Sequence, residues 1–95
     1  MAGINEELAL TRKAKAAIEK LQRREKIIEH LRNANIIARR ATSTEGSLNG
    51  ARQNARIALG ALIPALEAEL ETLELKLKAK VAVNDWIKEL EAAKR

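Results

Sequence analysis

The sequence contains no cysteine, tyrosine or phenylalanine, and it has only one histidine, one aspartate and one tryptophan. Without cysteine the chain has no disulfide frame, no thiolate metal site and no cysteine nucleophile. The single histidine, His30, has no second histidine to complete a metal pair, and we expect it at the surface or its boundary. Groups that serve catalysis are therefore scarce. We expect a protein that is not an enzyme and that carries no metal or other cofactor.

Long apolar runs are also missing. The longest run, 57–66, is too short to span a bilayer and contains Gly60 and Pro64. No signal-peptide pattern is visible, so we expect a cytoplasmic protein without a membrane span. The apolar face of the segment 4–41 lacks the tryptophan and phenylalanine that interfacial helices usually carry, which disfavours binding at a membrane surface.

The abundant residues are those that form helices. Alanine, glutamate, lysine, leucine and arginine make up 61 of the 95 residues, a bias typical of long helices or coiled coils. We therefore predict an all-α fold with a single domain over 1–95. A core built partly from 18 alanines buries little apolar area per residue, and small domains are marginally stable. Both facts favour a homo-oligomeric helical bundle or a protein partner.

The segment 4–41 contains neither proline nor glycine, and its apolar residues recur with a helical period of 3.5–3.6. This pattern predicts one helix over 4–41, which would be roughly 55 Å long. Asn35 interrupts the stripe. It would set the register of an assembly if it faced the core, but we favour a solvated position for it. The small or apolar residues of the stripe are Leu10, Ala14, Ala17, Leu21, Ile28, Leu31 and Ala38.

Turn-forming residues gather at 42–50, and we interpret this segment as the bend of a long antiparallel helical hairpin. A second apolar stripe predicts another helix over 51–82. Pro64 lies inside it, and its ring clashes with the carbonyl group of Gly60, four residues earlier. We therefore expect either a kink at 60–64 or a helix that starts anew at Pro64.

The end of the chain permits two interpretations. Residues 73–83 alternate between apolar and mostly charged types, which is a strand pattern. Those residues are helix formers, however, and the chain offers no second strand to pair with, so we favour a helix. Asn84 and Asp85 then predict a break before a short helix over 86–94. Trp86 in that helix is either a core anchor, which we favour, or a hot spot of a partner interface.

Pairing the two helices about a bend near residue 46 brings small residues together and neutralises charge. Close packing requires such complementary sizes. The facing alanines are Ala34, Ala38 and Ala41 on one helix and Ala51, Ala55 and Ala58 on the other. The same pairing sets a basic group, Lys20, Arg23 and Arg24, against an acidic one, Glu67, Glu69 and Glu71.

Five arginines near the bend are not matched by acids in this pairing, and together they form the predicted binding site. Their planar side chains suit bidentate contacts to phosphate or carboxylate. A solvated hairpin end, with arginine stems covering alanine-rich surface, is the simpler interpretation. The five are Arg32, Arg39, Arg40, Arg52 and Arg56.

The leading functional hypothesis is a small helical interaction module, such as an adaptor, inhibitor or assembly factor, that binds an unidentified protein. The alternative is an oligomeric protein that contacts the phosphates of nucleic acid through the arginines near the bend. The sequence lacks aromatic residues that would stack on single strands. The nine-residue bend at 42–50 is also too long for the turn of a helix-turn-helix.

Overall fold

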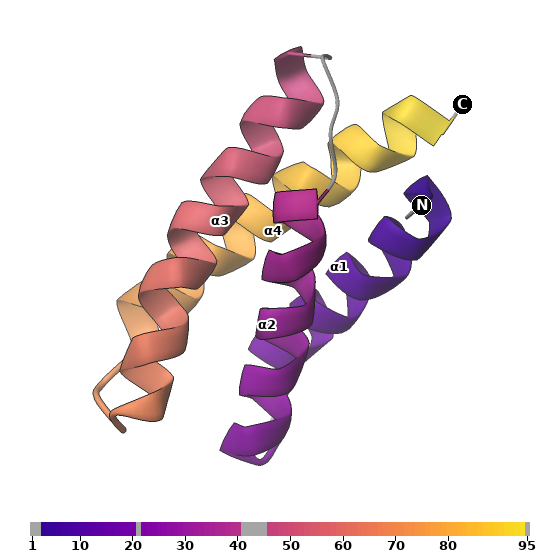
Figure 1. Cartoon of the computed structure of the whole chain (residues 1–95). Helices are drawn as coiled ribbons and strands as arrows, with labels where there is room; N and C mark the ends of the chain where they lie inside the picture. Colours follow the sequence, from indigo (N-terminus) through magenta and orange to yellow (C-terminus); the bar gives the residue numbers. More distant parts are fainter. Residues whose placement is uncertain (1–2, 21, 41–45, 95) are drawn as a thin grey trace.

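A computed structural model describes residues 3–20, 22–40 and 46–94 of the chain. In these residues the backbone forms four helices and no strand: α1 (Ile4–Glu19), α2 (Arg24–Arg40), α3 (Gly46–Glu67) and α4 (Leu73–Lys94) (Figure 1). The predicted all-α class is therefore confirmed.

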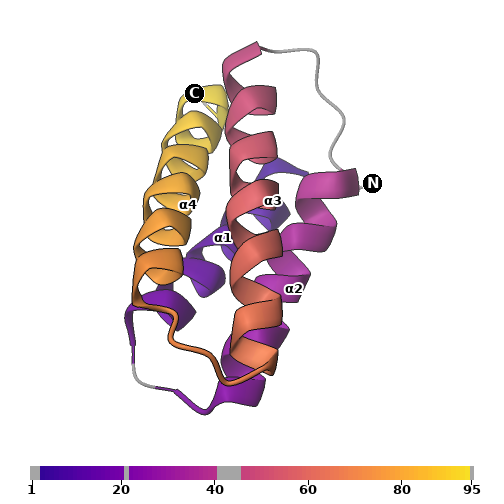
Figure 2. The same ribbon diagram turned by 90° about the vertical axis from the view of Figure 1, so that its left-hand side faces the viewer.

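The helices form a closed ring. Each helix packs against the next one along the chain, and α1 also packs against α4. The links that end α1 and α3 lie at the same end of the bundle (Figure 2). The molecule measures 38 × 19 × 19 Å along its principal axes. The chain thus forms an elongated four-helix bundle in which α1 lies diagonally across from α3.

The prediction of a single helix over 4–41 is wrong. Lys20 has an extended backbone (φ −103°, ψ 150°), and Gln22 and Arg23 are not helical. A continuous helix of that length would span roughly 55 Å and expose much of its apolar stripe. Breaking it lets α1 fold back beside α2, so that both apolar faces are buried in a molecule 38 Å long. Packing therefore outweighs the uninterrupted helical propensity of the segment.

No helix starts anew at Pro64, because α3 passes through both Gly60 and Pro64 and ends at Glu67. That alternative is therefore wrong, and the kink at 60–64 stays a prediction. A Schellman motif closes it: the Leu70 amide donates to the Ala65 carbonyl (3.0 Å), and the Glu69 amide donates to the Leu66 carbonyl (3.2 Å). Glu69 adopts the left-handed conformation (φ 58°) that glycine usually takes at this position. The second half of the predicted hairpin is therefore also divided in two.

The last part of the chain is one continuous helix. Thr72, a residue type preferred at the N-cap position, precedes α4, and its carbonyl accepts a hydrogen bond from the Lys76 amide (2.7 Å). The helix runs on through Asn84 and Asp85, so the predicted break there is wrong and no separate helix forms over 86–94. The strand alternative for 73–83 is wrong as well. Of the predicted bend, 46–50 belong to α3, and 42–45 lie outside the described residues.

The core combines a few large side chains with many small ones. Ala34 and Ala38 of α2 and Ala51 and Ala55 of α3 are all buried, in line with the predicted close approach of these helices. The largest fully buried side chains are Trp86, Leu8, Leu31, Leu59, Leu62, Leu90, Val83 and Thr11. A single copy of the chain therefore builds a core despite its alanine content.

Candidate interaction surfaces

A buried polar cluster joins three helices inside the bundle. The Arg52 guanidinium on α3 donates from Nε to Glu7 Oε2 and from Nη2 to Glu7 Oε1, both at 2.8 Å. The Trp86 indole N–H on α4 donates to Glu7 Oε2 at 2.7 Å. Glu7, Arg52 and Trp86 are 3%, 5% and 0% exposed. Arg52 of α3 thus reaches Glu7 of α1.

Two predicted binding residues are therefore not at the surface. Arg52 is held by Glu7. Trp86 is a core residue rather than an interface anchor, in agreement with the interpretation that the sequence favours. The Glu7 carboxylate accepts three charge-assisted hydrogen bonds, and it lies in the first turn of α1, where the helix dipole favours negative charge. Within the part of the chain that the structure describes, Arg52 Nη1 has no hydrogen-bond partner. The cluster explains why a charged pair persists inside this core.

No signal in the sequence pointed to the contact between Glu7 and Arg52. Glu7 is 45 residues from Arg52 and 79 from Trp86. In a single hairpin, α1 would face only α4, so Glu7 and Arg52 would lie far apart. The contact exists because each half of the hairpin folds back on itself.

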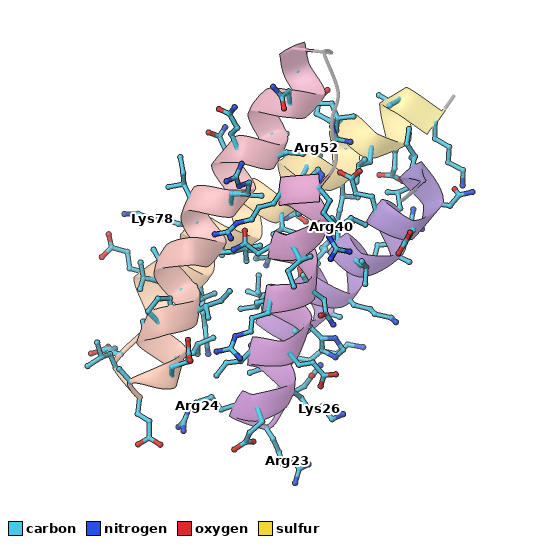
Figure 3. The ribbon with its side chains drawn as sticks, in the orientation of Figure 1. Arg23, Arg24, Lys26, Arg40, Arg52 and Lys78 are labelled. Carbon is cyan, nitrogen blue, oxygen red and sulfur yellow. The ribbon has the colours of Figure 1, made fainter. Side chains whose placement is uncertain are left out.

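Arg32 is also engaged within the chain. Its Nη2 donates to Glu67 Oε2 at 2.6 Å on the surface between α2 and α3. Arg24, at the start of α2, pairs with Glu69 beyond the end of α3, as the predicted basic and acidic groups suggested (Figure 3). Arg32 therefore has an acidic partner that the predicted pairing did not give it.

Two of the five predicted arginines share one groove. Arg39 of α2 and Arg56 of α3 line a surface groove of about 310 Å³ together with Asn35, Gln53, Ile57 and Gly60. Within the described residues, neither arginine has a carboxylate oxygen within 4.0 Å. Asn35 Oδ1 has no hydrogen-bond partner there. We call this the cationic groove. Of the five arginines in the predicted binding site, it brings together Arg39 and Arg56.

Arg40 lies apart from that groove. It lines a second hollow of about 260 Å³, where α2 meets α1, with Glu6, Leu10, Asn33, Ile36 and Ile37 (Figure 3). A carboxylate therefore stands in the same hollow as Arg40. The five arginines that cluster in the sequence are distributed over the core, an exposed ion pair and two separate hollows.

A second surface is apolar. Leu73, Leu77 and Val81 follow one another at four-residue intervals on α4, and they are 65%, 56% and 61% exposed. We call these three residues the exposed stripe. Leu70, just before the helix, is 64% exposed as well. A groove of about 410 Å³ between α3 and α4 adjoins the stripe and is lined by Asn54, Leu77, Lys78, Val81, Ala82 and Asp85.

The exposed stripe lies within the predicted second apolar stripe over 51–82, yet its side chains do not enter the core. The opposite face of α4 instead carries the buried residues Ala79, Val83, Trp86 and Leu90. The alternation over 73–83 was the missed signal: apolar residues with period two on a helix lie on more than one face. One face of α4 fills the bundle, and the exposed stripe is left on the other.

No group of three or more histidine, aspartate or glutamate side chains in the described residues is placed to hold a metal ion. His30 is partly exposed on α2. No helix in this part of the chain has the length and apolar content needed to cross a membrane. The candidate sites are therefore surfaces: the exposed stripe and the cationic groove.

No protein-family model, curated protein or solved structure matches this chain.

Proposed function

We propose that this chain is a small, non-enzymatic interaction module that acts by binding protein through the outer face of α4. The observation that supports it is the exposed stripe, three large apolar side chains more than half exposed on a helix that is already anchored in the core by its other face. An adaptor, an inhibitor or an assembly factor would use such a face.

Covering the exposed stripe with another protein is favourable in free energy. Fully burying a leucine or valine side chain contributes about 1.5–3 kcal/mol. Apolar patches of more than a few hundred Å² are rare on isolated monomers and mark contact sites. The stripe adds nothing to the core of its own chain, because Val83, Trp86 and Leu90 supply that face. Contact with another protein gives the stripe an energetic role.

Affinity capture from native cells tests this proposal. The tagged chain is compared with the variant Leu73→Glu/Leu77→Glu, with nuclease present throughout. We expect a bound protein, identified by mass spectrometry, that is at least about tenfold depleted with the variant, since one buried apolar side chain is worth that factor. Ile36→Glu is the control, since Ile36 is 46% exposed on α2 and lies outside both the stripe and the cationic groove. Equal capture by wild type and stripe variant contradicts the proposal.

A second candidate function is nucleic-acid binding through the cationic groove. The observation that favours it is that Arg39 and Arg56 line one groove and face no carboxylate within the described residues. Arg40 lies in a separate hollow with Glu6, and Arg32 and Arg52 are engaged with glutamates. Two arginines in one groove in place of five weaken this alternative, because each phosphate contact adds to affinity and to its salt dependence.

Retention on DNA and RNA columns tests the alternative. Arg39→Glu/Arg56→Glu should elute at lower salt than wild type if the groove binds phosphates. Lys88→Glu/Lys94→Glu is the control, because it changes the net charge equally at exposed positions of α4. If both double variants and wild type elute together, the groove does not bind nucleic acid.

A further inference from the structure

The exposed stripe has a symmetry that suits one particular occupant. Leu73 and Val81 each lie four residues from Leu77. Rows of residues at four-residue spacing form the ridges by which helices pack into one another's grooves. An antiparallel copy of α4, related by a two-fold axis at Leu77, presents the same ridge in return. Leu73 of one copy then meets Val81 of the other, beside the groove between α3 and α4.

We propose that a second copy of this chain covers the exposed stripe, with its α4 antiparallel to the first and the two-fold axis at Leu77. This inference rests on the proposed function, and it names the protein that the α4 face binds. Such an interface is isologous, so the same patch is used on both copies and the assembly closes as a dimer.

Charges along one edge of the stripe support the antiparallel arrangement. Glu74 and Lys78 lie on the same edge, and their side chains, 82% and 66% exposed, approach to 3.2 Å. Figure 3 shows Lys78 pointing away from the bundle beside α3. With the axis at Leu77, Glu74 of each copy lies within about 3 Å along the helix of Lys78 of the other. Both copies therefore gain an intermolecular ion pair.

The other edge of the stripe carries Lys76 and Lys80. In the dimer these lysines approach their counterparts, which by itself disfavours pairing. Lys80 is matched within its own chain, since Glu19 of α1 lies 4.0 Å from it. Repulsion on this edge is therefore reduced, and the favourable edge is the one with Glu74 and Lys78.

The size of the face sets the expected strength. Three side chains more than half exposed, together with the groove, make an apolar patch of a few hundred Å² on each copy. Two such patches bring the buried area to about 1,000 Å², the lower end for specific interfaces. We therefore expect a dimer that forms in the micromolar range.

A cysteine scan tests the placement of the axis, because the chain has no cysteine of its own. Leu77→Cys should form a disulfide-linked dimer under mild oxidation, since residues at the axis approach closely enough for a disulfide bond. Lys88→Cys is the control on the same outer side of α4. Position 88 is eleven residues away, so its two copies are about 33 Å apart in the dimer. Cross-linking at position 88, or none at position 77, contradicts the arrangement.

A charge exchange tests the paired edge. Glu74→Lys and Lys78→Glu each place like charges opposite each other in a homodimer, and each variant alone should dimerise about tenfold more weakly than wild type. An equimolar mixture of the two restores both ion pairs and should recover dimerisation. Light scattering and sedimentation over a concentration series measure both effects. A mixture no tighter than the separate variants overturns the proposed pairing.

The remaining outcomes separate this inference from the proposed function. A strictly 10.5 kDa species at all concentrations refutes self-pairing but leaves the proposed function open, since capture of another protein through the stripe tests that function independently. A dimer that persists in Leu73→Glu/Leu77→Glu places the second copy elsewhere and also refutes the inference. A dimer that is lost in this variant but not in Ile36→Glu supports it.

Discussion

Two arginine–glutamate pairs of this protein have similar geometry but different surroundings. The closest atoms of Arg52 and Glu7 are 2.8 Å apart, and those of Arg32 and Glu67 are 2.6 Å apart. The first pair has side chains 6% and 3% exposed, whereas the second has side chains 55% and 45% exposed. Distance alone would make the exposed pair the stronger interaction. Burial makes the pair of Arg52 and Glu7 the stronger one, because water screens the exposed charges and is excluded from the buried ones.

The comparison shows what each pair does for the protein. The buried pair crosses the core and ties α1 to α3, two helices that are not neighbours in the ring. Losing one partner would leave a charge without compensation in a dry environment. The exposed pair joins neighbouring helices, and water can replace either partner.

The largest expected effect comes from neutralising one acid of each pair. Glu7→Gln should lower the free energy of unfolding by about 3–5 kcal/mol, because Arg52 then stays buried without a counter-charge. Glu67→Gln, the matched change in the exposed pair, should lower it by less than about 1 kcal/mol. Urea denaturation followed by circular dichroism measures both. Equal losses in the two variants would show that burial does not govern these pairs.

A double-mutant cycle sharpens the same comparison. In Glu7→Gln/Arg52→Met the buried charges are removed together, and the remaining amide still accepts a hydrogen bond from the Trp86 indole. The double variant should be more stable than Glu7→Gln alone, with a coupling free energy of about 2 kcal/mol. For Arg32→Met with Glu67→Gln the coupling should stay below about 1 kcal/mol. Additive losses at Glu7 and Arg52 contradict this account of the cluster.

Trp86→Phe tests the third member of the cluster. The change removes one N–H donor to a charged acceptor while most of the ring remains, and should lower the free energy of unfolding by about 2 kcal/mol. In the Glu7→Gln background the same change should have a smaller effect, since the acceptor is no longer charged. Circular dichroism is the appropriate signal, because Trp86 is the only aromatic residue. An undiminished effect in that background would separate Trp86 from the cluster.

The smallest expected change in the free energy of unfolding concerns a second exposed ion pair, Arg24 with Glu69. Glu69 has a φ of 58°, a conformation that disfavours side chains with a Cβ atom by about 1 kcal/mol. Glu69→Gly should therefore raise the free energy of unfolding by about 0.5 kcal/mol despite losing the ion pair. Glu71→Gly, in the same link but without a positive φ, is the control and should be slightly destabilising. A loss of stability in Glu69→Gly would mean that the ion pair outweighs the backbone strain.

The outcomes for particular residues show how far local patterns reach. The alanines at 34, 38, 51 and 55 were expected to face one another, and they are buried between α2 and α3. Arg24 and Glu69 were assigned to opposed charged groups and form an ion pair. Both predictions needed only the helical period and the approximate antiparallel pairing of the two halves of the chain.

Other assignments required knowledge of the whole bundle. Arg52 and Arg56 are one helical turn apart, yet Arg52 crosses the core and Arg56 lines a surface groove. Leu77 and Val83 both belong to an apolar pattern, yet Leu77 is exposed and Val83 is fully buried. The spacing of apolar residues along the sequence identifies which residues share a face of a helix. The helices packed against it decide which face is buried.

The sequence by itself determined the helical class, the apolar stripes and the closeness of α2 and α3, because propensity and periodicity are local properties. The tertiary structure alone decided where the long segments break, which arginine enters the core and which side of α4 stays exposed. The reason is that folding each half of the hairpin back on itself buries more apolar surface than straight helices would. That gain exceeds the small local preference of 20–23 for continuing the helix, and it places Glu7, Arg52 and Trp86 together.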